Sequence, residues 1–248
     1  MPQIDSTKPF TLAPAILSAF HAAGYPSAII AGGACRDTIL GVPVKDIDVF
    51  VNAEDLLKHE PSNITAMHFA YGNNMEYHNH RVKAEIGCSH SLMTIDLAQS
   101  HAAVSSSGPL ANLEDSGPAG SISIRQLNQF NPFIGTSTFY VAGIPVQFIV
   151  VGCDPKTYVT DYMDVGLCKA YTEDGNRIKT TPAFNLDRAN KTLSITVDQP
   201  GAPESFLHDT VTSNHLARMR AKYPTHRVIL SPSTQANFPT YTIPAAYK

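Results

Sequence analysis

The sequence AGGACRDTILG spans Ala31–Gly41, and the run VKDIDVFV follows it at Val44–Val51. A Gly-Gly turn therefore precedes an Arg-Asp pair, and two carboxylates at positions i and i+2 come after both. Glycines let backbone N–H groups come close to a phosphate. Two acidic side chains on one face of a strand can hold a divalent cation. The stretch predicts a site for a phosphorylated ligand and a metal ion.

The residues around the glycines predict a strand, a turn and a helix in that order. The apolar run Pro26–Ala31 predicts a buried strand, and Cys35–Leu40 predicts a short helix that ends at Gly41. A strand of this kind delivers the glycine turn to the end of a sheet. The start of the helix then offers free N–H groups and the positive end of its dipole to an anion.

The second half of the stretch predicts a strand that carries two carboxylates. Alternation indicates a strand over Asp46–Val51, with Asp46 and Asp48 on one face. Ile47 and Val49 then point into the core. Parallel carboxylates this close repel one another unless a cation lies between them, and Mg²⁺ bound by carboxylates and phosphates fits that requirement.

The pattern GG-x-x-RD-x-x-LG followed by D-I-D resembles the head domain of the DNA-polymerase-β-like nucleotidyltransferases. By motif, the closest branch is that of the bacterial poly(A) polymerases and CCA-adding enzymes. The resemblance rests on Gly32–Gly41 and on Asp46-Ile47-Asp48, which occur in order and at the expected spacing. Later parts, VPVQFIVVG, VTDYMDVGLCKAY and FNLDRANKTLSI, resemble small stand-alone nucleotidyltransferase-like proteins of bacteriophages more than tRNA-processing enzymes with long bodies.

The resemblance implies an α+β chain with the nucleotidyltransferase fold: a mixed central sheet, flanking helices and a loop-rich insertion. We expect a core over residues 1–165, with the insertion at about 60–135. Residues 166–248 would form a C-terminal hairpin and helix extension packed on the core, or the whole chain would be one domain.

Elsewhere, hydrophobic periodicity and turn residues predict further elements. They are a helix over residues 11–23 that stops at Gly24, a short helix at Ala53–His59, a hairpin over 138–151 around Gly143, a hairpin in which Tyr158–Tyr171 and Arg177–Thr181 flank the turn Asp174-Gly175, a strand over 192–197 and a last helix over Pro203–Tyr223.

The resemblance also implies roles for the motif residues. Asp46 and Asp48 would be the catalytic carboxylates and would bind two Mg²⁺ ions, one to activate an acceptor hydroxyl and one to stabilise the pyrophosphate leaving group. Four residues would bind the nucleotide: Gly32 and Gly33 at the triphosphate, Arg36 near the sugar or phosphates, and Asp37 as an orienting group.

The resemblance further implies a third carboxylate from a later central strand. The strand predicted at Ile144–Val151 has the neutral Gln147 at that position, and Asp96 within SLMTIDLA is the other candidate ligand. Asp161 and Asp164 are weaker candidates. A glutamine can coordinate a metal through its carbonyl oxygen, but it adds no negative charge.

These observations give a first function and an alternative. The first is an Mg²⁺-dependent nucleotidyltransferase that transfers NMP from an NTP such as ATP to an acceptor hydroxyl, with release of pyrophosphate. The acceptor could be an RNA 3′ end, including that of a tRNA, a protein or a small molecule. The alternative is a catalytically weakened module that keeps the fold and binds a nucleotide or a partner.

Structural interpretations stand beside these roles. The two glycines can serve a tight turn alone, Arg36 and Asp37 can form an ion pair at the helix start, and the basic residues near His215 can form a solvated helix face or guide RNA. His78 and His80 could bind a transition metal if they share a strand face, although scattered surface histidines are commoner.

Composition narrows the class of protein. The formal net charge of −3 argues against tight non-specific binding to nucleic acid. None of the 4 cysteines has C-x-x-C spacing, so we expect no zinc site. No run of 18 apolar residues occurs, so we expect no membrane partner. We expect a soluble, cytoplasmic protein, located in the host cytoplasm if a phage encodes it.

Overall fold

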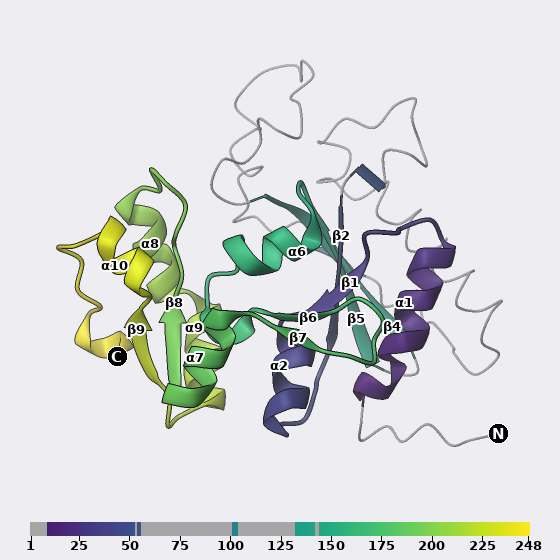
Figure 1. Cartoon of the computed structure of the whole chain (residues 1–248), viewed down its shortest axis with the longest axis horizontal. Helices are drawn as coiled ribbons and strands as arrows, with labels where there is room; N and C mark the ends of the chain where they lie inside the picture. Colours follow the sequence, from purple (N-terminus) through teal and green to yellow (C-terminus); the bar gives the residue numbers. More distant parts are fainter. Residues whose placement is uncertain (1–8, 53, 56–100, 104–131, 142–143) are drawn as a thin grey trace, which may run out of the picture. The chain divides into compact units, whose positions relative to one another are not determined.

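The structure is a computed structural model that describes residues 9–52, 54–55, 101–103, 132–141 and 144–248 (Figure 1). The chain forms two compact units. The first contains Met1–Lys156 and Tyr171–Ile178, and the second contains Thr157–Ala170 and Lys179–Lys248. The chain therefore passes between the units three times, and the expected division at residue 165 stays a prediction.

The first unit is built on a mixed sheet. Its neighbouring strands run in the order β3-β4-β5-β2-β1-β6. Strands β2 and β5 are parallel, and the other neighbours are antiparallel. The bounds are His101–Ala103 for β3, Phe133–Val141 for β4, Ile144–Val151 for β5, Ile47–Asn52 for β2, Ile29–Ala31 for β1 and Ala170–Thr172 for β6. The predicted α+β class with a mixed central sheet is confirmed, as is the hairpin over 138–151.

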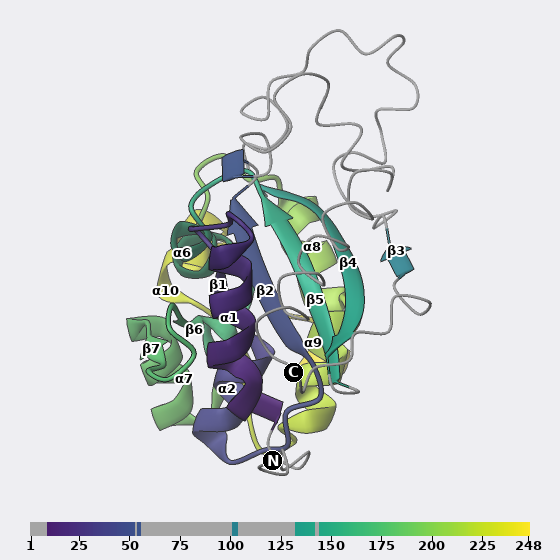
Figure 2. The ribbon, with the colours of Figure 1, turned by 90° about the vertical axis from the view of Figure 1, so that its right-hand side faces the viewer.

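Helix α1 (Ala13–Ala22) covers one face of this sheet (Figure 2). Its Phe20 ring lies 6.0 Å from the ring of Tyr25 and 5.5 Å from that of Phe148 on β5, and all three side chains are fully buried. Gly24 has φ 92°, a conformation that glycine adopts without strain. The predicted helix and its stop at Gly24 are confirmed.

The two faces of β2 differ in burial. Ile47, Val49 and Val51 are fully buried on one face, whereas the other face has half-buried Asp48 and Asn52 on either side of the buried Phe50. The strand begins at Ile47, one residue later than predicted, so that Asp46 lies just before it.

The second unit consists of short helices and a small parallel sheet of β8 and β9. Its elements are a π-helical turn at Tyr158–Tyr162, a 3-10 turn at Gly166–Cys168, β7 (Lys179–Thr180), α7 (Pro182–Asn190), β8 (Thr192–Ile195), α8 (Glu204–Thr212), α9 (Asn214–Lys222), β9 (Arg227–Leu230), α10 (Pro232–Asn237) and a 3-10 turn at Ala245–Tyr247. The predicted strand over 192–197 is confirmed at Thr192–Ile195, which form β8.

The hairpin predicted from Tyr158–Tyr171 is wrong over most of its first arm. Helix α6 (Pro155–Thr157) and the π-helical turn occupy its start, and only Ala170–Thr172 is extended. The predicted turn is present, since Asp174 Oδ1 accepts hydrogen bonds from the backbone N–H groups of Asn176 and Arg177. Aromatic and β-branched residues gave this segment strand character, and its tertiary packing overrides that propensity.

The single helix predicted over Pro203–Tyr223 is two helices. Ser213 has ψ 148°, which ends α8, and its Oγ accepts a hydrogen bond from Leu216 N, which begins α9. Helix α7 and strand β9 were not predicted. A sequence signal for α7 exists, because Thr181 caps it by accepting from Phe184 N and a proline follows directly.

Two predicted regions fall largely outside the described residues. They are the short helix at Ala53–His59 and the insertion at about 60–135, of which the structure describes only 101–103 and 132–135.

Candidate functional site

The Gly-Gly turn lies between β1 and α2 (Gly33–Leu40). The predicted order of strand, turn and helix is confirmed, although the strand begins later, at Ile29, and the helix earlier, at Gly33. Gly32 is the N-cap of α2 and has φ 70° and ψ −125°, a conformation that side chains with a Cβ rarely adopt. Its carbonyl accepts a hydrogen bond from Arg36 N at 3.0 Å, which closes the first turn. Gly41 ends the helix with φ 67°, as predicted.

Three motif residues meet at Gly33. A Cβ built on Gly33 would lie 3.6 Å from Nη2 of Arg36 and 4.0 Å from Oδ2 of Asp48. The Arg36 guanidinium and the Asp48 carboxylate therefore flank the Gly33 backbone, where the absent side chain leaves room. The guanidinium can bind a phosphate, and the carboxylate can bind the cation that accompanies the phosphate.

The strand register adds Gln147 to this group. Asp48 on β2 is the register partner of Ala31 on β1 and of Gln147 on β5. Register partners on neighbouring strands project to the same face of a sheet, and Asp48 and Gln147 are both half-buried. The amide of Gln147 therefore lies beside the Asp48 carboxylate. Ala31, the partner of Asp48 on β1, is directly followed by the glycine turn at Gly32.

Arg36 and Asp37 form a buried ion pair, with Arg36 Nε donating to Asp37 Oδ1 at 2.8 Å. Both side chains are less than a tenth exposed, so this contact fixes the guanidinium at the start of α2. The structural interpretation of the pair is therefore correct. The Nη2 atom of the same guanidinium still faces Gly33, so a ligand-binding role is compatible with it.

The other predicted ligands lie in different places. Asp46 directly precedes β2 and is half-buried. Asp96 lies outside the described residues, as do His78 and His80. Asp161 and Asp164 belong to the second unit.

Cys35 lies in the first turn of α2 but is not suited to be a nucleophile. Its side chain is fully buried, and its Sγ donates to the carbonyl of Ile30 at 3.4 Å. Burial, and then the nearby charge of Asp48, raise the pKa of the Cys35 thiol far above its usual range. The thiol is therefore neutral and unreactive at physiological pH.

The donor atoms near Asp48 are oxygens, which suit Mg²⁺. Asp46 and Asp48 offer carboxylate oxygens, and Gln147 offers an amide oxygen. Within the described part of the chain, no group of three His, Cys, Asp or Glu residues could hold a metal ion. The oxygens of Asp46, Asp48 and Gln147 fit a hard cation that also takes oxygens from its substrate.

Several solved structures of tRNA-processing enzymes are similar to this chain. One, described as a tRNA-processing enzyme in an apo form, is 16% identical with a TM-score of 0.46, and the match covers 96% of this chain and 47% of that one. A Bacillus stearothermophilus CCA-adding enzyme in complex with CTP is 15% identical with a TM-score of 0.44, over 92% of this chain and 42% of that one. A tRNA nucleotidyltransferase with a primer tRNA and an incoming ATP analog is 17% identical with a TM-score of 0.41, over 85% and 45%.

The chain spans less than half of the length of each of these structures. No protein-family model matches the chain, and no curated protein matches it in sequence. Because the TM-scores are below 0.5, the function of this chain has to be argued from its own site. Among the helices that the structure describes, none is long and apolar enough to cross a membrane.

Proposed function

We propose that the first unit is a nucleotidyltransferase that binds an NTP with Mg²⁺ and transfers NMP to an acceptor hydroxyl. One observation carries the proposal: the Arg36 guanidinium and the Asp48 carboxylate lie within 4.0 Å of the position that a Gly33 Cβ would occupy. A turn without side chains, a fixed cation and a carboxylate together match the needs of a metal-bound triphosphate.

The chain's own residues hold the phosphates in this proposal. Gly32 and Gly33 let the triphosphate approach the free N–H groups at the start of α2, where the helix dipole favours an anion. Arg36 Nη2 neutralises phosphate charge, while Asp37 keeps the guanidinium in place through Nε. Because both side chains are buried, the cation is positioned before the nucleotide binds.

Asp46, Asp48 and the amide oxygen of Gln147 would hold the Mg²⁺ ions, of which we propose two. When bound, these ions make the acceptor hydroxyl more acidic and stabilise negative charge on the leaving pyrophosphate. The acceptor oxygen then bonds to the α-phosphorus as the bond from that phosphorus to the β-phosphate oxygen breaks. RNA 3′ ends, protein hydroxyls and small molecules are the candidate acceptors.

Gln147 favours a second candidate function. The neutral amide of Gln147 lies beside Asp48, at a position where a third carboxylate would add negative charge. A site with two carboxylates binds a metal less tightly and activates a hydroxyl less than a site with three. The second candidate is therefore a module that binds nucleotide and metal with little transfer.

The test is pyrophosphate release from each labelled NTP with Mg²⁺ and a panel of RNA, protein and small-molecule acceptors. Wild type should release pyrophosphate, and Asp48→Asn should lower the rate by about 100-fold or more, because it removes a metal ligand. Asp154→Asn is the matched control, since Asp154 is exposed in the same unit.

Equal rates for wild type and Asp48→Asn would contradict the proposed site. Nucleotide binding without release from any acceptor would favour the binding module.

A further inference from the structure

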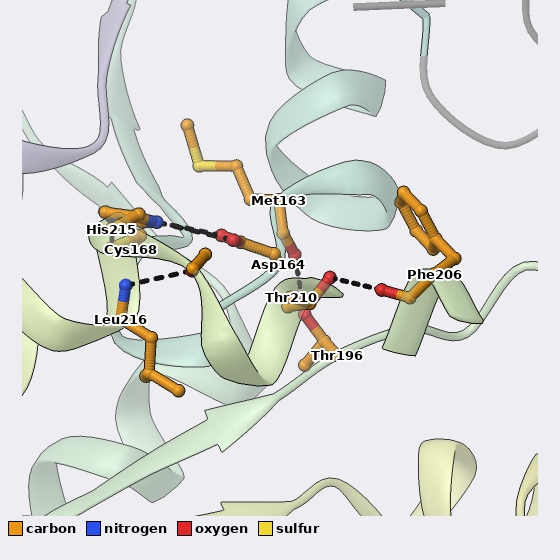
Figure 3. A network of polar contacts seen from close by, with 9 residues as sticks. Met163, Asp164, Cys168, Thr196, Phe206, Thr210, His215 and Leu216 are labelled. Carbon is orange, nitrogen blue, oxygen red and sulfur yellow. Dashed lines mark hydrogen bonds and ion pairs between the residues drawn. The ribbon is translucent and has the colours of Figure 1, made fainter. Parts of the chain in front are cut away.

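In the second unit, three side chains from separate segments meet (Figure 3). His215 Nδ1 lies 3.3 Å from Asp164 Oδ2, and His215 Nε2 lies 3.9 Å from Cys168 Sγ. Cys168 ends the 3-10 turn at Gly166–Cys168, and His215 lies in the first turn of α9. We call these three residues the imidazole cluster. The order carboxylate, imidazole, thiol is that of an activated cysteine.

The backbone on both sides of the imidazole cluster is fixed by hydrogen bonds. Thr196 N donates to the carbonyl of Asp164 at 2.8 Å, and Thr196 Oγ1 donates to the carbonyl of Met163 at 2.6 Å. On the other side, Ser213 caps the helix that carries His215. Residues held by such contacts keep the mutual geometry that proton transfer needs.

The charges within the cluster favour a protonated imidazole. Burial lowers the pKa of His215, but the Asp164 carboxylate and then Cys168 outweigh burial and raise it to about 11. Burial likewise raises the pKa of Asp164, and the neighbouring His215 outweighs it, so that the pKa lies below its usual value. At neutral pH the imidazolium can donate from Nδ1 to Asp164 and from Nε2 towards the Cys168 sulfur.

Lys169 is another charged group near the cluster. Its ammonium donates to the carbonyl of Thr160 at 2.8 Å, and its charge helps to lower the pKa of Asp164. The His215 and Asp164 side chains are 38% and 33% exposed, whereas Cys168 is 4% exposed. Solvent therefore contacts the cluster at His215 and Asp164, next to the buried sulfur.

We propose that Cys168 is a peroxide-reactive thiol, with His215 as its proton donor and Asp164 as a residue that positions the imidazole. The Cys168 S–H proton passes to water, and the sulfur then attacks one oxygen of hydrogen peroxide, so that a new S–O bond forms and the O–O bond breaks. The departing hydroxide takes a proton from His215 and leaves as water. Sulfur is oxidised by two electrons to a sulfenic acid, and the peroxide is reduced. The reaction needs no nucleotide, so it is independent of the proposed transfer activity.

The chain contains a natural comparison for this thiol. Cys35 is as buried as Cys168, but its neighbour is the Asp48 carboxylate instead of an imidazole. A difference in reactivity between the two thiols therefore reports their surroundings: burial and the Asp48 charge at Cys35, and the His215 imidazole at Cys168. Cys153 is half-buried and better exposed than either, so it controls for access.

The test treats the reduced full-length chain with hydrogen peroxide and traps sulfenic acid with a dimedone-type probe. Peptide mass spectrometry then gives a rate for each cysteine. Cys168 should react about 10-fold faster than Cys35 and Cys153, because an adjacent imidazolium activates a thiol. A Cys168 rate no higher than that of Cys153 would overturn the proposal.

Three variants assign the roles. His215→Gln should slow Cys168 by about 100-fold, and Asp164→Asn should slow it less, while Asp164→Glu restores much of the rate. The Cys35 and Cys153 rates in the same molecules, with circular dichroism, show whether a variant is folded. If His215→Gln does not fold, the variants Asp164→Asn and Asp164→Glu test the cluster. Equal Cys168 rates in Asp164→Asn and wild type would overturn the role of the carboxylate. In a folded His215→Gln variant, an unchanged Cys168 rate would overturn the proton-donor role.

Discussion

Each of the two units contains a buried thiol, but the charged group beside the thiol differs between them. Around Gly33, which together with Gly32, Arg36 and Asp48 we call the glycine cluster, a buried thiol lies close to a carboxylate. In the imidazole cluster a buried thiol lies beside an imidazole. Burial, and to a lesser extent the carboxylate, keeps the first thiol neutral, whereas the Arg36 guanidinium and the Asp48 carboxylate suit that cluster to phosphates and cations. The imidazole makes the second cluster suited to chemistry at sulfur.

Each unit also contains a buried, hydrogen-bonded carboxylate. Asp37 holds Arg36 in the glycine cluster. Near Cys168, Asp187 accepts hydrogen bonds from Thr192 Oγ1 and from the backbone and side chain of Ser194. These carboxylates have structural roles, and changing them or their close neighbours should disturb one unit and spare the other.

The largest effect is expected from Asp37→Asn. It takes away the charge paired with the buried Arg36, and breaking a buried ion pair from one side costs about 3–5 kcal/mol. Denaturant unfolding measures the loss, and Asp154→Asn at an exposed position is the matched control. A cost below about 1 kcal/mol would put the pair in the class of surface ion pairs.

Gly166→Ala should have the next largest effect, in the second unit. Its Cβ would collide with Ser194 Oγ and lie 2.6 Å from Asp187 Oδ2, which overpacks the core by about 2–3 kcal/mol. Gly201→Ala is the control: it has φ 79° and nothing within 4 Å of the added Cβ, so only backbone strain of about 1 kcal/mol applies. Equal costs for the two variants would show that Asp187 and Ser194 move aside.

Gln147→Glu sharpens the comparison by placing a carboxylate beside Asp48, in addition to those of Asp46 and Asp48. Because Gln147 is the register partner of Asp48, we expect Mg²⁺ affinity to rise about 10-fold. Titration calorimetry with Mg²⁺ and an NTP measures the gain, and Gln147→Ala should lower affinity. Unchanged affinity in both variants would remove Gln147 from the ligand set.

The smallest effect concerns the pH dependence of the imidazole cluster. The folded pKa of His215 is about 11, above its ordinary value of 6.5, so its stabilisation is complete below pH 6.5 and is lost as pH rises towards 11. The pKa of Asp164 is lowered from 3.8, so the Asp164 contribution is lost only in acid. Between pH 6 and 9 the melting temperature of wild type should therefore fall by about 2–4 °C relative to His215→Gln, a small change because both groups are partly exposed.

His226→Gln is the control for that measurement, since burial lowers the pKa of His226 and its stability effect lies below pH 6.5. Parallel pH profiles for wild type and His215→Gln would contradict the His215 ion pair.

The glycine turn, α2 and β2 could be predicted because their signals are local: two glycines, a helix stop at Gly41 and alternation after Asp46. The β5 strand and its residue Gln147 were also within reach, since β-branched residues mark the strand and the structure places Gln147 beside Asp48. The assignment of catalytic and metal-binding roles to these residues stays a prediction.

The imidazole cluster could not be predicted, because 51 residues separate Asp164 from His215. From the sequence, His215 could be recognised only as one of several basic residues on a predicted helix. That helix is interrupted at Ser213, which caps α9, and the hydrophobic pattern runs through this position without a break. The helical turn at Tyr158–Tyr162 could not be predicted either, because its aromatic and β-branched residues favour strands and tertiary packing overrides that preference.

The central claim is that the glycine cluster binds a metal-bound triphosphate. Titration calorimetry of an NTP with Mg²⁺ against wild type, Asp48→Asn and Asp154→Asn tests it most directly. We predict tight, Mg²⁺-dependent binding to wild type and Asp154→Asn, and binding to Asp48→Asn that is weaker by about 10-fold or more. Equal affinity of all three proteins for the nucleotide, with or without Mg²⁺, would contradict the claim.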